Sequence, residues 1–568
     1  MLVELDTLAD VLGLDAGLTA SVLPGVDEIV PAARTILVRF DPARTTAARV
    51  RAWVARTELG DSARRDVPDV ALDVVYDGAD LADTAALLGL REAELIARHV
   101  AARWRVAFTG FAPGFAYLAA ADWPFDVPRL ATPRTRVPAG AVGLAAEFTG
   151  AYPRETPGGW RLIGTTTATL FDPAASSSVL LTPGAWVRFR AERAVAVGAE
   201  RVVPFSEPGE PMPAAPVTIE PTRTASVTGE PMPAASVTIE PTRTASADGE
   251  PTRTASVTIE PTPAASVTIG PPRTEASRPA IRVDAAASAT VQDLGRAGRA
   301  RLGISRSGGL DRGAMRLANR LLGNADDAPA IEIALGGFAA TALRDLWIVV
   351  TGAWAPLRID GRPVDPYVPQ RWRTGVRLEI GWGGHGARSY LGVRGGIDVS
   401  SAAGSRSTDT LAGLGPDRIA AGAELAVGAG APHPIPPLEI APWGWPADPI
   451  EVELGPGPRA DEFAPLAHRA LVEEVWTVAA QTDRIGMRLD GPVLPRRATG
   501  EVPSEGMVPG AMQVPPHGRP VILLADGPVT GGYPVIAVVT DATLDRLAQA
   551  GPGTRVRFRR AVVGGIRA

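Results

Sequence analysis

Four segments rich in glycine or proline carry the side chains whose types and spacing are best suited to chemistry. The first places Arg129, Arg134 and Arg136 in a proline-stiffened stretch at residues 128–138. Guanidinium groups bind carboxylates and phosphates through pairs of hydrogen bonds. This stretch therefore predicts an anion-binding loop, and a solvated surface loop is the alternative.

The second segment, RSGGLD at residues 306–311, joins a Gly-Gly turn to the start of a predicted helix. Such a turn presents backbone N–H groups to an anion, and Gln292, Asp293 and Arg296 lie upstream. An ordinary helix N-cap at Asp311 explains the same residues equally well.

Two further loops have a similar composition. GSRSTD at 404–409 places Arg406 among hydroxyl groups and an aspartate, and QVPPHGRP at 513–520 accompanies Asp526 and TGGYP at 530–534. Adjacent glycines let a backbone approach a ligand closely or adopt positive φ. A tight hairpin has the same requirement, so an architectural role is the alternative.

Several catalytic classes are excluded by missing residues. The five histidines show no HxH or HExxH spacing and there is no cysteine, so the sequence predicts no metal site. Walker A and GxSxG motifs are absent. All 57 basic residues are arginines, so this chain carries no covalent biotin and no P-loop or Schiff-base lysine.

The composition bounds the class of protein. At 568 residues, with 45% hydrophobic and 21% charged residues, the chain is long enough for several globular domains. A net charge of −5 gives no electrostatic reason for a nucleic-acid partner. Neither a signal peptide nor an apolar run long enough for a membrane span is apparent. We expect a soluble cytoplasmic protein without a membrane partner.

The elements that must position these residues begin with two regions. Residues 1–80 predict a small α+β domain, with strands at 35–40 and 70–76 and a helix at 46–59. Residues 81–205 begin with a helical stretch and continue as short strands between Pro/Gly turns, which favours a barrel or sandwich.

Residues 206–280 differ from the rest of the chain. Near-repeats of Pro, Thr, Ser, Ala and Glu, without aromatic residues, cannot bury enough apolar surface to offset their ordering entropy. The segment predicts an extended, disordered linker. A solenoid is the alternative, but its frequent prolines would remove ladder donors.

Order is expected again in two further lobes. Residues 281–447 predict a first lobe of short strands with one helix, which begins at the N-cap Asp311 and stops at Gly323. Residues 448–568 predict a second lobe that ends in a strand-rich block.

The two halves of the chain share one pattern. The first copy reads VPAG at 137–140, TPGGW at 156–160 and PGAWVRF at 183–189. The second copy has the same order and nearly the same spacing: VPG at 508–510, TGGY at 530–533 and PGTRVRF at 552–558. The chain therefore carries two related β-rich units.

Residues 1–205 resemble the B subunit of bacterial ATP-dependent 5-oxoprolinase, the Kip inhibitor or allophanate hydrolase subunit 1 family. The matching motifs are GFAPGFAY at 110–117, TPRTRVPAG at 132–140, YP at 152–153, TPGGW at 156–160 and LFDP at 170–173. One position departs from the family: Phe148 stands where Gln is usual, which bears on the ligand of this part.

Residues 282–568 resemble the C subunit of the same enzyme, the biotin-dependent carboxyltransferase or allophanate hydrolase subunit 2 family. The matching motifs are TVQDLGR at 290–296, SG at 307–308, Asp311, LANR at 317–320, Glu332, GGID at 395–398, GSRSTD at 404–409, QVP at 513–515 and GGYP at 531–534. The chain thus resembles a fusion of the B and C subunits.

This resemblance implies a mainly β fold with α+β elements, in which cyclophilin-like β-barrel lobes are duplicated beside the small N-terminal α+β domain. It implies conversion of 5-oxo-L-proline to L-glutamate with hydrolysis of ATP, with Mg²⁺ as its companion ion. A separate protein like the A subunit of 5-oxoprolinase would complete the activity. Pairing of B and C lobes, within or between chains, would give a hetero-oligomer or homo-oligomer.

The resemblance also implies roles for individual residues, because activation of a lactam by phosphate needs positive charge and a placed carboxylate. The candidate acid/base or Mg²⁺-binding groups are Asp311, Glu332 and Asp526. The candidate substrate- or phosphate-binding residues are Arg134, Arg136, Arg306, Arg406, Gln513, Gly158, Gly159, Gly531 and Gly532.

Two alternatives remain open, since one fold can serve several functions. One is a biotin-dependent carboxyltransferase of the urea carboxylase type, which would need a biotin carrier in trans because the chain lacks lysine. The other is a regulatory protein that resembles the kinase inhibitor and has no catalysis of its own.

Overall fold

A computed structural model describes residues 1–60, 69–173, 175, 177–192, 235–245, 251–261, 278–437, 444, 447–497, 502–563 and 566–567. The chain divides into two compact units, one made of Met1–Ala194 and Thr274–Ala568 and the other of Val195–Arg273. We call Met1–Ala194 the B part and Thr274–Ala568 the C part. No helix among the described residues has the length and apolar character that crossing a membrane requires.

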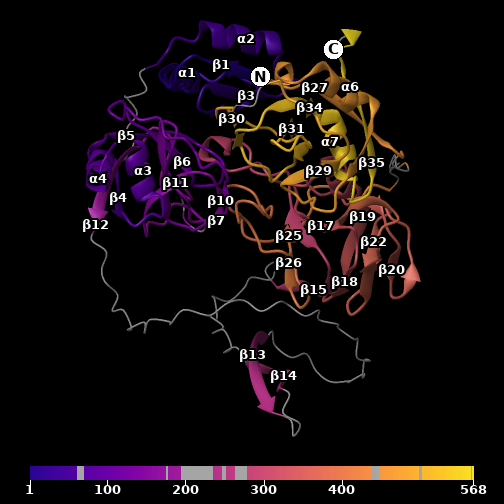
Figure 1. Ribbon diagram of the computed structural model, residues 1–568. Coiled ribbons are helices and arrows are strands. Elements are labelled where there is room, and N and C mark those ends of the chain that lie inside the picture. Colours follow the sequence, from indigo (N-terminus) through magenta and orange to yellow (C-terminus); the bar gives the residue numbers. More distant parts are fainter. Residues whose placement is uncertain are drawn as a thin grey trace. The chain divides into compact units, whose positions relative to one another are not determined.

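The B part opens with a small α+β domain, whose sheet has the strand order β1-β3-β2. Its elements are β1 (Leu2–Glu4), α1 (Leu8–Ala20), β2 (Val26–Pro31), β3 (Thr35–Phe40) and α2 (Ala47–Arg56). Each helix is capped by a threonine, Thr7 or Thr46, whose hydroxyl accepts a backbone N–H from the first turn. The predicted strand at 35–40 and helix at 46–59 are confirmed (Figure 1).

A closed barrel with the strand order β11-β4-β12-β5-β6-β9-β8 follows. The elements of this region are β4 (Asp69–Val75), α3 (Leu81–Leu87), α4 (Glu92–Ala101), β5 (Trp104–Thr109), β6 (Ala116–Ala119), β7 (Arg134–Val137), β8 (Ala141–Ala145), β9 (Phe148–Ala151), β10 (Thr156–Gly158), β11 (Arg161–Thr165) and β12 (Trp186–Glu192). Strand β4 pairs in parallel with β12 along its whole length. The strand predicted at 70–76 therefore belongs to the barrel and not to the small domain, because its partner comes from the far end of the B part.

The first lobe of the C part is a pair of sheets with the orders β21-β20-β23-β18-β15-β26-β25 and β16-β17-β24-β19-β22. Buried side chains from both sheets form one core. The elements are β15 (Pro279–Ala286), β16 (Ala289–Gln292), η3 (Ala300–Leu302), α5 (Arg312–Leu321), β17 (Ala330–Ala334), β18 (Phe338–Ala342), β19 (Leu346–Trp354), β20 (Leu357–Ile359), β21 (Arg362–Pro363), β22 (Gln370–Trp372), β23 (Arg377–Ile380), β24 (His385–Val393), β25 (Ile397–Asp398) and β26 (Glu424–Val427).

The second lobe of the C part is another closed barrel, β27-β34-β31-β32-β29-β28-β35. The elements are β27 (Ile450–Pro456), η4 (Ala460–Glu462), α6 (Pro465–Glu473), β28 (Val475–Val478), β29 (Gly486–Asp490), β30 (Glu505–Gly506), β31 (Ala511–Gln513), β32 (Val521–Leu523), β33 (Thr530–Gly531), β34 (Val535–Val539), α7 (Asp541–Ala548), β35 (Arg555–Arg560), β36 (Val562–Val563) and β37 (Ile566–Arg567).

The two barrels have the same connectivity, which confirms the predicted duplication. In each, the first strand pairs in parallel with the last, β4 with β12 and β27 with β35. Each also carries a two-stranded ribbon, β7–β10 or β30–β33, and the second strand of each ribbon lies in a Gly-Gly motif. Gly140 and Gly510 immediately precede the equivalent strands β8 and β31, with φ of 80° and 92°, a conformation that favours glycine.

In the second unit, the structure describes one antiparallel pair of strands, β13 (Ala235–Ala245) and β14 (Pro251–Pro261). The other residues of the predicted linker at 206–280, apart from its C-terminal end, lie outside the described residues. The linker and the predicted domain boundaries therefore stay predictions.

Candidate functional site: a cavity beside a buried ion-pair network

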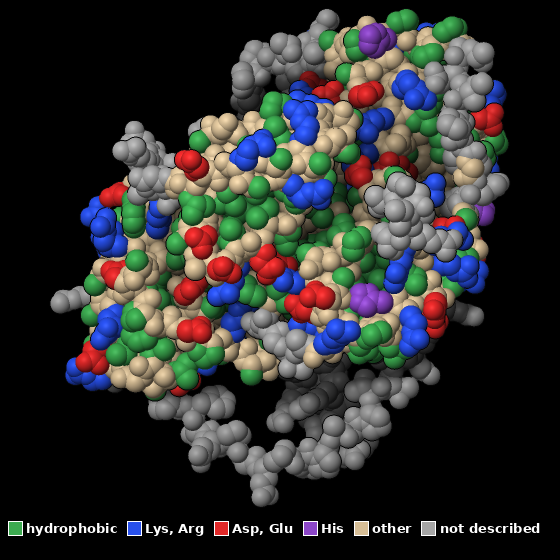
Figure 2. All heavy atoms as spheres, turned by 90° about the horizontal axis from the view of Figure 1, so that it is seen from above, with side chains coloured by type: hydrophobic (Ala, Val, Ile, Leu, Met, Phe, Trp, Pro, Cys, Tyr) green, Lys and Arg blue, Asp and Glu red, His purple; other side chains and the backbone are tan. Residues whose placement is uncertain are grey.

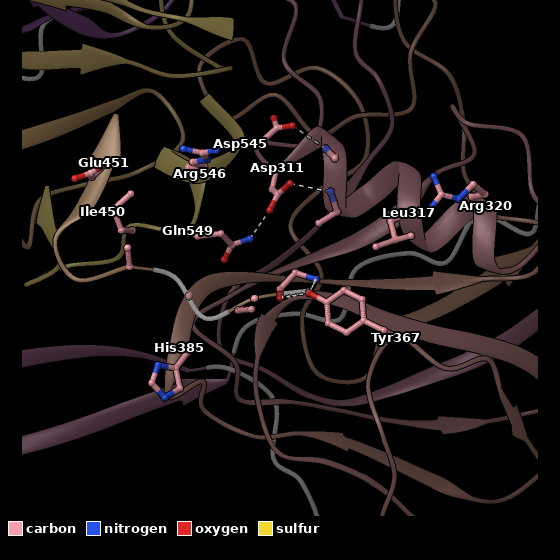
Figure 3. A pocket seen from close by; sticks show the side chains of 17 residues that line it. Asp311, Leu317, Arg320, Tyr367, His385, Ile450, Glu451, Asp545, Arg546 and Gln549 are labelled. Carbon is pink, nitrogen blue, oxygen red and sulfur yellow. Dashed lines mark hydrogen bonds between the residues drawn. The ribbon is translucent and has the colours of Figure 1, made fainter. Parts of the chain in front are cut away.

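A cavity of about 770 Å³ lies between the two lobes of the C part (Figure 3). Helix α5 and strands β19 and β24 supply one side, and β27 and α7 supply the other. The residues that line it are Asp311, Gly313, Ala314, Leu317, Arg320, Gly352, Ala353, Tyr367, His385, Gly386, Gly444, Ala447, Ile450, Glu451, Asp545, Arg546 and Gln549.

Asp311 is the sequence-predicted carboxylate that lines this cavity. It caps α5, since one carboxylate oxygen accepts the Ala314 N–H at 2.8 Å, and Gln549 Nε2 donates to the other at 2.6 Å. Burial raises the pKa of Asp311 from 3.8 to about 6, although both hydrogen bonds favour the charged form. The predicted N-cap and the helix that follows it are confirmed.

Gln549 connects the two sides of the cavity. Its Oε1 accepts the N–H groups of Ala387 and Arg388 on β24, at 3.0 and 3.1 Å. Its amide group donates to Asp311 and also to the Arg388 carbonyl. A single side chain that follows α7 thus fixes both the β24 edge and the Asp311 carboxylate.

Behind Asp311, Glu332 lies in a buried network. The Tyr390 hydroxyl donates to Glu332 Oε2 at 2.7 Å and accepts the Asp311 N–H at 2.8 Å, while Arg484 donates to Glu332 Oε1. Burial by itself would raise the pKa of Glu332, but Arg484, Arg388 and the hydrogen bonds outweigh it and the pKa is lowered. Glu332 is therefore held as a carboxylate and lies away from the cavity surface.

Asp526 belongs to the same network. Arg484 donates to both of its carboxylate oxygens at 3.0 Å, Ser307 Oγ donates at 2.7 Å, and Thr410 donates through its N–H and its hydroxyl. Burial would raise the pKa of Asp526, yet the Arg484 charge and these donors lower it. Three segments far apart in sequence, those of Ser307, Thr410 and Arg484, thus converge on the Asp526 carboxylate.

The predicted loop at 404–409 folds around Asp293. Ser405 and Ser407 donate their hydroxyls to Asp293 Oδ1, and the Arg406 N–H donates to Oδ2 at 2.6 Å. Despite its burial, these donors lower the pKa of Asp293. The cluster stabilises the loop conformation that the sequence singled out.

The arginines predicted to bind phosphate lie elsewhere. Arg134 pairs with Asp80 at 2.7 Å, and Arg136 pairs with Glu155 at 2.5 Å on the surface of the B part. Arg306 Nε donates to a backbone carbonyl at 3.2 Å. Arg406 Nε donates to the Val399 carbonyl at 3.0 Å, and its side chain lines a smaller cavity of about 240 Å³. Their predicted roles stay predictions.

The Gly-Gly turns are closely packed. A Cβ atom at Gly158 would meet the Tyr152 hydroxyl, and one at Gly531 would lie 2.5 Å from Gln513 Nε2. At Gly159 and Gly532 the nearest atoms would be 3.7 and 3.2 Å away. Close packing accounts for Gly158 and Gly531 without a ligand, and the predicted binding roles of these glycines and of Gln513 stay predictions.

The position that departs from the family lies inside the first barrel. The Phe148 ring packs edge-on against Phe108 and Tyr117, with ring centroids 5.7 Å apart in both pairs. Phe148 is buried in this aromatic cluster, which also contains Phe115 and Trp160. An apolar ring is thus accommodated where the family usually has an amide.

The B and C parts meet along a seam. Gly110 leaves no room for a side chain against Thr530, whose hydroxyl accepts the Phe111 N–H at 2.9 Å. Thr109 Oγ1 donates to the Arg301 carbonyl at 2.7 Å. Arg301 in turn binds Asp15 through both carboxylate oxygens.

Apolar side chains from both parts pack across the same seam. One cluster joins Val30 and Leu37 to Ala300 and Val529. Another joins Val179 of the B part to residues of the C part, namely Ile304, Ala412 and Leu414. On the face shown in Figure 2, basic and acidic side chains are interspersed between apolar areas.

The sequence patterns missed three residues that organise this region: Tyr390, Arg484 and Gln549. Arg484 and Gln549 contact residues more than a hundred positions away, and neither stands in a glycine-rich motif. A buried polar residue in an ordinary stretch of sequence gives no local signal, because its partners are known only after folding.

Two family models match the chain. The model described as carboxyltransferase domain, subdomain C and D, matches residues 2–181. The model described as carboxyltransferase domain, subdomain A and B, matches residues 302–560. The two matches fall on the B and C parts.

Individual relatives likewise match either the B part or the C part. The C subunit of 5-oxoprolinase from Escherichia coli (strain K12) is 37% identical over 274 residues, which cover 47% of this chain and 87% of the relative. The B subunit of 5-oxoprolinase from Escherichia coli O157:H7 is 40% identical over 174 residues, which cover 29% of this chain and 78% of the relative. Urea amidolyase of Saccharomyces cerevisiae is 33% identical over 300 residues, but the match covers only 16% of that protein.

A solved structure contains both parts in one chain. The crystal structure of TTHA0988 matches with a TM-score of 0.77 and 32% sequence identity, over 98% of this chain and 99% of that chain. The duplicated barrels and the lobe between them are thus an arrangement already seen in a protein crystal. This chain belongs to the carboxyltransferase-domain family of the 5-oxoprolinase B and C subunits, and it carries the counterparts of both in one polypeptide.

Proposed function

We propose that this protein is the B–C component of an ATP-dependent 5-oxoprolinase, which converts 5-oxo-L-proline to L-glutamate together with a separate A subunit. One observation carries the proposal: a single chain matches most of a B subunit of this enzyme and most of a C subunit. The contacts along the seam support it, since they join the two counterparts within one compact unit. Because this reaction consumes ATP, we propose that the protein acts in the cytoplasm.

The chemistry explains why ATP is needed. Resonance protects a lactam from hydrolysis, and transfer of the terminal phosphoryl group of ATP to the lactam oxygen removes that protection. A first water attacks the activated carbon, the ring C–N bond breaks and the nitrogen takes up a proton, which leaves an acyl phosphate. A second water then hydrolyses this acyl phosphate to the carboxylate and free phosphate. These steps require cations beside the phosphoryl group and a carboxylate that can exchange a proton.

Within this proposal, Asp311 is the carboxylate that moves the proton. It lines the cavity, and a pKa of about 6 lets it change protonation state near neutral pH. Glu332 and Asp526 instead keep Arg484 and the Asp311 backbone in place, since both carboxylates are buried against Arg484.

The cavity also suits the Mg²⁺ ion that accompanies ATP. Such an ion neutralises phosphate charge, and it takes one or two carboxylates from the protein and its other ligands from phosphate and water. Glu451 on β27, half-buried at the cavity wall, is a carboxylate of this kind, and one of its oxygens already accepts a hydrogen bond from Arg559. Among the described residues there is no cluster of three or more potential metal ligands, so the protein supplies only part of the coordination.

The test combines the full chain with ATP, 5-oxo-L-proline and the separate A subunit, and it measures L-glutamate. We expect glutamate only when all four are present, and at least a tenfold lower rate for Asp311→Asn, since general acid–base catalysis contributes roughly 10²-fold or more. Asp417→Asn, a change at an exposed aspartate, is the control and should keep the rate of the unaltered protein. Absence of glutamate when the A subunit is known to be active would refute the proposal.

A second candidate is a carboxyltransferase that acts with a biotin carrier in trans. The descriptions of both family models and the match to urea amidolyase favour it. The same preparation, supplied with a carboxybiotinylated carrier protein and urea, provides the comparison. Carboxyl transfer without glutamate formation would reverse the order of the two candidates.

A further inference from the structure

Helix α7 of the second lobe turns one polar face toward the start of α5 in the first lobe of the C part. This face carries Asp541, Asp545 and Gln549, which are spaced four residues apart and therefore lie on one side of the helix. Both aspartates accept hydrogen bonds from Arg312, and Gln549 donates to Asp311. Three side chains of α7 thus hold the first residues of α5.

Asp545 completes the N-terminal cap of α5. The first N–H groups of a helix have no partner within the helix. In α5, the Ala314 N–H is bonded by Asp311 of the same lobe. The Arg312 and Gly313 N–H groups donate instead to the two carboxylate oxygens of Asp545, at 3.2 and 3.0 Å (Figure 3). Two aspartates from different lobes therefore cap one helix.

Asp545 and Gln549 act on the Asp311 carboxylate in opposite directions. Burial is the main reason that the pKa of Asp311 is raised to about 6. The hydrogen bond from Gln549 Nε2, 2.6 Å long, favours the charged form and lowers this pKa. The nearby Asp545 carboxylate disfavours a second negative charge and raises it.

Other titratable and charged groups also surround Asp311. Glu332 on β17 lies behind it and pairs with Arg388 and Arg484. Two tyrosines interact with it, Tyr367 and Tyr390. The cavity wall adds His385, Glu451, Arg320 and Arg546. All of these groups stay unchanged when only Asp545 or Gln549 is replaced, so a change in the titration of Asp311 then reports the replaced residue.

We propose that Asp545 and Gln549 are positioning residues for the proton transfer assigned to Asp311: from the second lobe they fix its carboxylate at the cavity and act on it in opposite directions, Asp545 through its charge and Gln549 through its hydrogen bond. The proposal rests on the proposed function, since Asp311 moves the proton there. Neither residue has to contact the substrate, because each acts through Asp311. Both lobes of the C part are therefore needed to complete the site.

The experiment measures the pH dependence of glutamate formation by the full chain with ATP, 5-oxo-L-proline and the A subunit. The limb of the pH–rate profile that Asp311→Asn removes belongs to Asp311. Gln549→Leu removes a charge-assisted hydrogen bond, so we expect this limb to move to higher pH by about one unit. Asp545→Asn keeps the shape of the side chain but removes its charge, so we expect the limb to move to lower pH by at least about 0.3 unit.

Gln481→Leu and Asp417→Asn are the matched controls, because both residues are exposed and do not line the cavity. Their profiles should coincide with that of the unaltered protein. Gln549→Glu is a second variant of the same size, which keeps an acceptor for the β24 N–H groups but loses the donor to Asp311. It should also move the limb to higher pH. The proposal is overturned if the Asp545 and Gln549 variants move the limb in the same direction, or if they slow the reaction without moving it.

A second measurement does not need the reaction. The stabilisation that Asp311 contributes is lost as the pH rises through its pKa, and urea unfolding of each variant with and without Asp311→Asn isolates this loss. We expect the loss to extend to higher pH in Gln549→Leu and to end at lower pH in Asp545→Asn. Circular-dichroism melting curves confirm that each variant is folded.

Failure of the positioning roles and failure of the proposed function remain distinguishable. If the unfolding curves shift as expected but the unaltered protein forms no glutamate with an active A subunit, the positioning roles stand and the oxoprolinase function is wrong. If glutamate forms but neither the unfolding curves nor the pH–rate limb shifts, the function stands and the positioning roles are wrong.

Discussion

Asp311 combines two tasks at the scale of a single residue, because it caps α5 and presents a carboxylate to the cavity. Its raised pKa means that the folded protein binds this proton more tightly than the unfolded chain does. The stabilisation is complete below pH 3.8 and is lost as the pH rises to about 6. At about 1.4 kcal/mol per pH unit, this loss is on the order of 3 kcal/mol.

Urea unfolding of Asp311→Asn at several pH values tests this effect. Asparagine also caps helices well, so the variant keeps the cap but cannot titrate. Between pH 3.8 and about 6 the unaltered protein should lose stability relative to the variant. Parallel curves for the two proteins would show that Asp311 titrates normally, and Asp417→Asn should give a curve parallel to that of the unaltered protein.

Arg484 is the residue on which the buried network depends. It holds Glu332 and both oxygens of Asp526, and its side chain is 9% exposed. Arg484→Met leaves the buried Asp526 without its countercharge and leaves Glu332 with Arg388 alone, and we expect a loss of about 3–5 kcal/mol in the free energy of unfolding. Arg488→Met, at a nearby exposed position, should change it by less than about 0.5 kcal/mol. Equal effects of the two changes in urea unfolding would contradict this account.

At the scale of elements, the loop after β5 packs directly against β33. Gly110→Ala would place a methyl group against Thr530, so we expect the free energy of unfolding to fall by about 1–3 kcal/mol. Gly430→Ala is the control, since no atom lies within 4 Å of the place where its Cβ would stand. Guanidinium unfolding measures both variants. A normal stability of Gly110→Ala would mean that the seam is looser than these contacts indicate.

The sequence predicted the positions of some elements more closely than it predicted which other elements they pair with. The N-cap residue and the spacing of apolar residues located α5, and the alternation of apolar and polar residues located β3, because both signals are local. The same alternation located β4 but assigned it to the wrong neighbour, since its parallel partner β12 lies more than a hundred residues away. The repeated Gly and Pro motifs succeeded over a longer range, because equivalent turns recur in both barrels.

For the whole molecule, the seam should hold the two parts together without the linker. Ion pairs such as Arg301–Asp15 and two apolar clusters cross it. We expect the B and C parts to elute together in gel filtration after cleavage at a protease site inserted between residues 206 and 234. Arg301→Ala should promote their separation at low protein concentration. Separate elution of the parts in the unaltered protein would show that the linker, and not the seam, keeps them together.

The sequence by itself determined the β-rich class, the duplication, the B–C organisation and Asp311 as a helix cap, because each depends on local spacing or on motifs that recur. Only the tertiary structure decided which candidates share a site. It placed Asp311 at a cavity with Arg320 and Arg546, enclosed Glu332 and Asp526 around Arg484, and left Arg134 and Arg136 in ion pairs on the B part. The physical reason is that burial and charge pairing arise between segments far apart in the chain, where spacing carries no information.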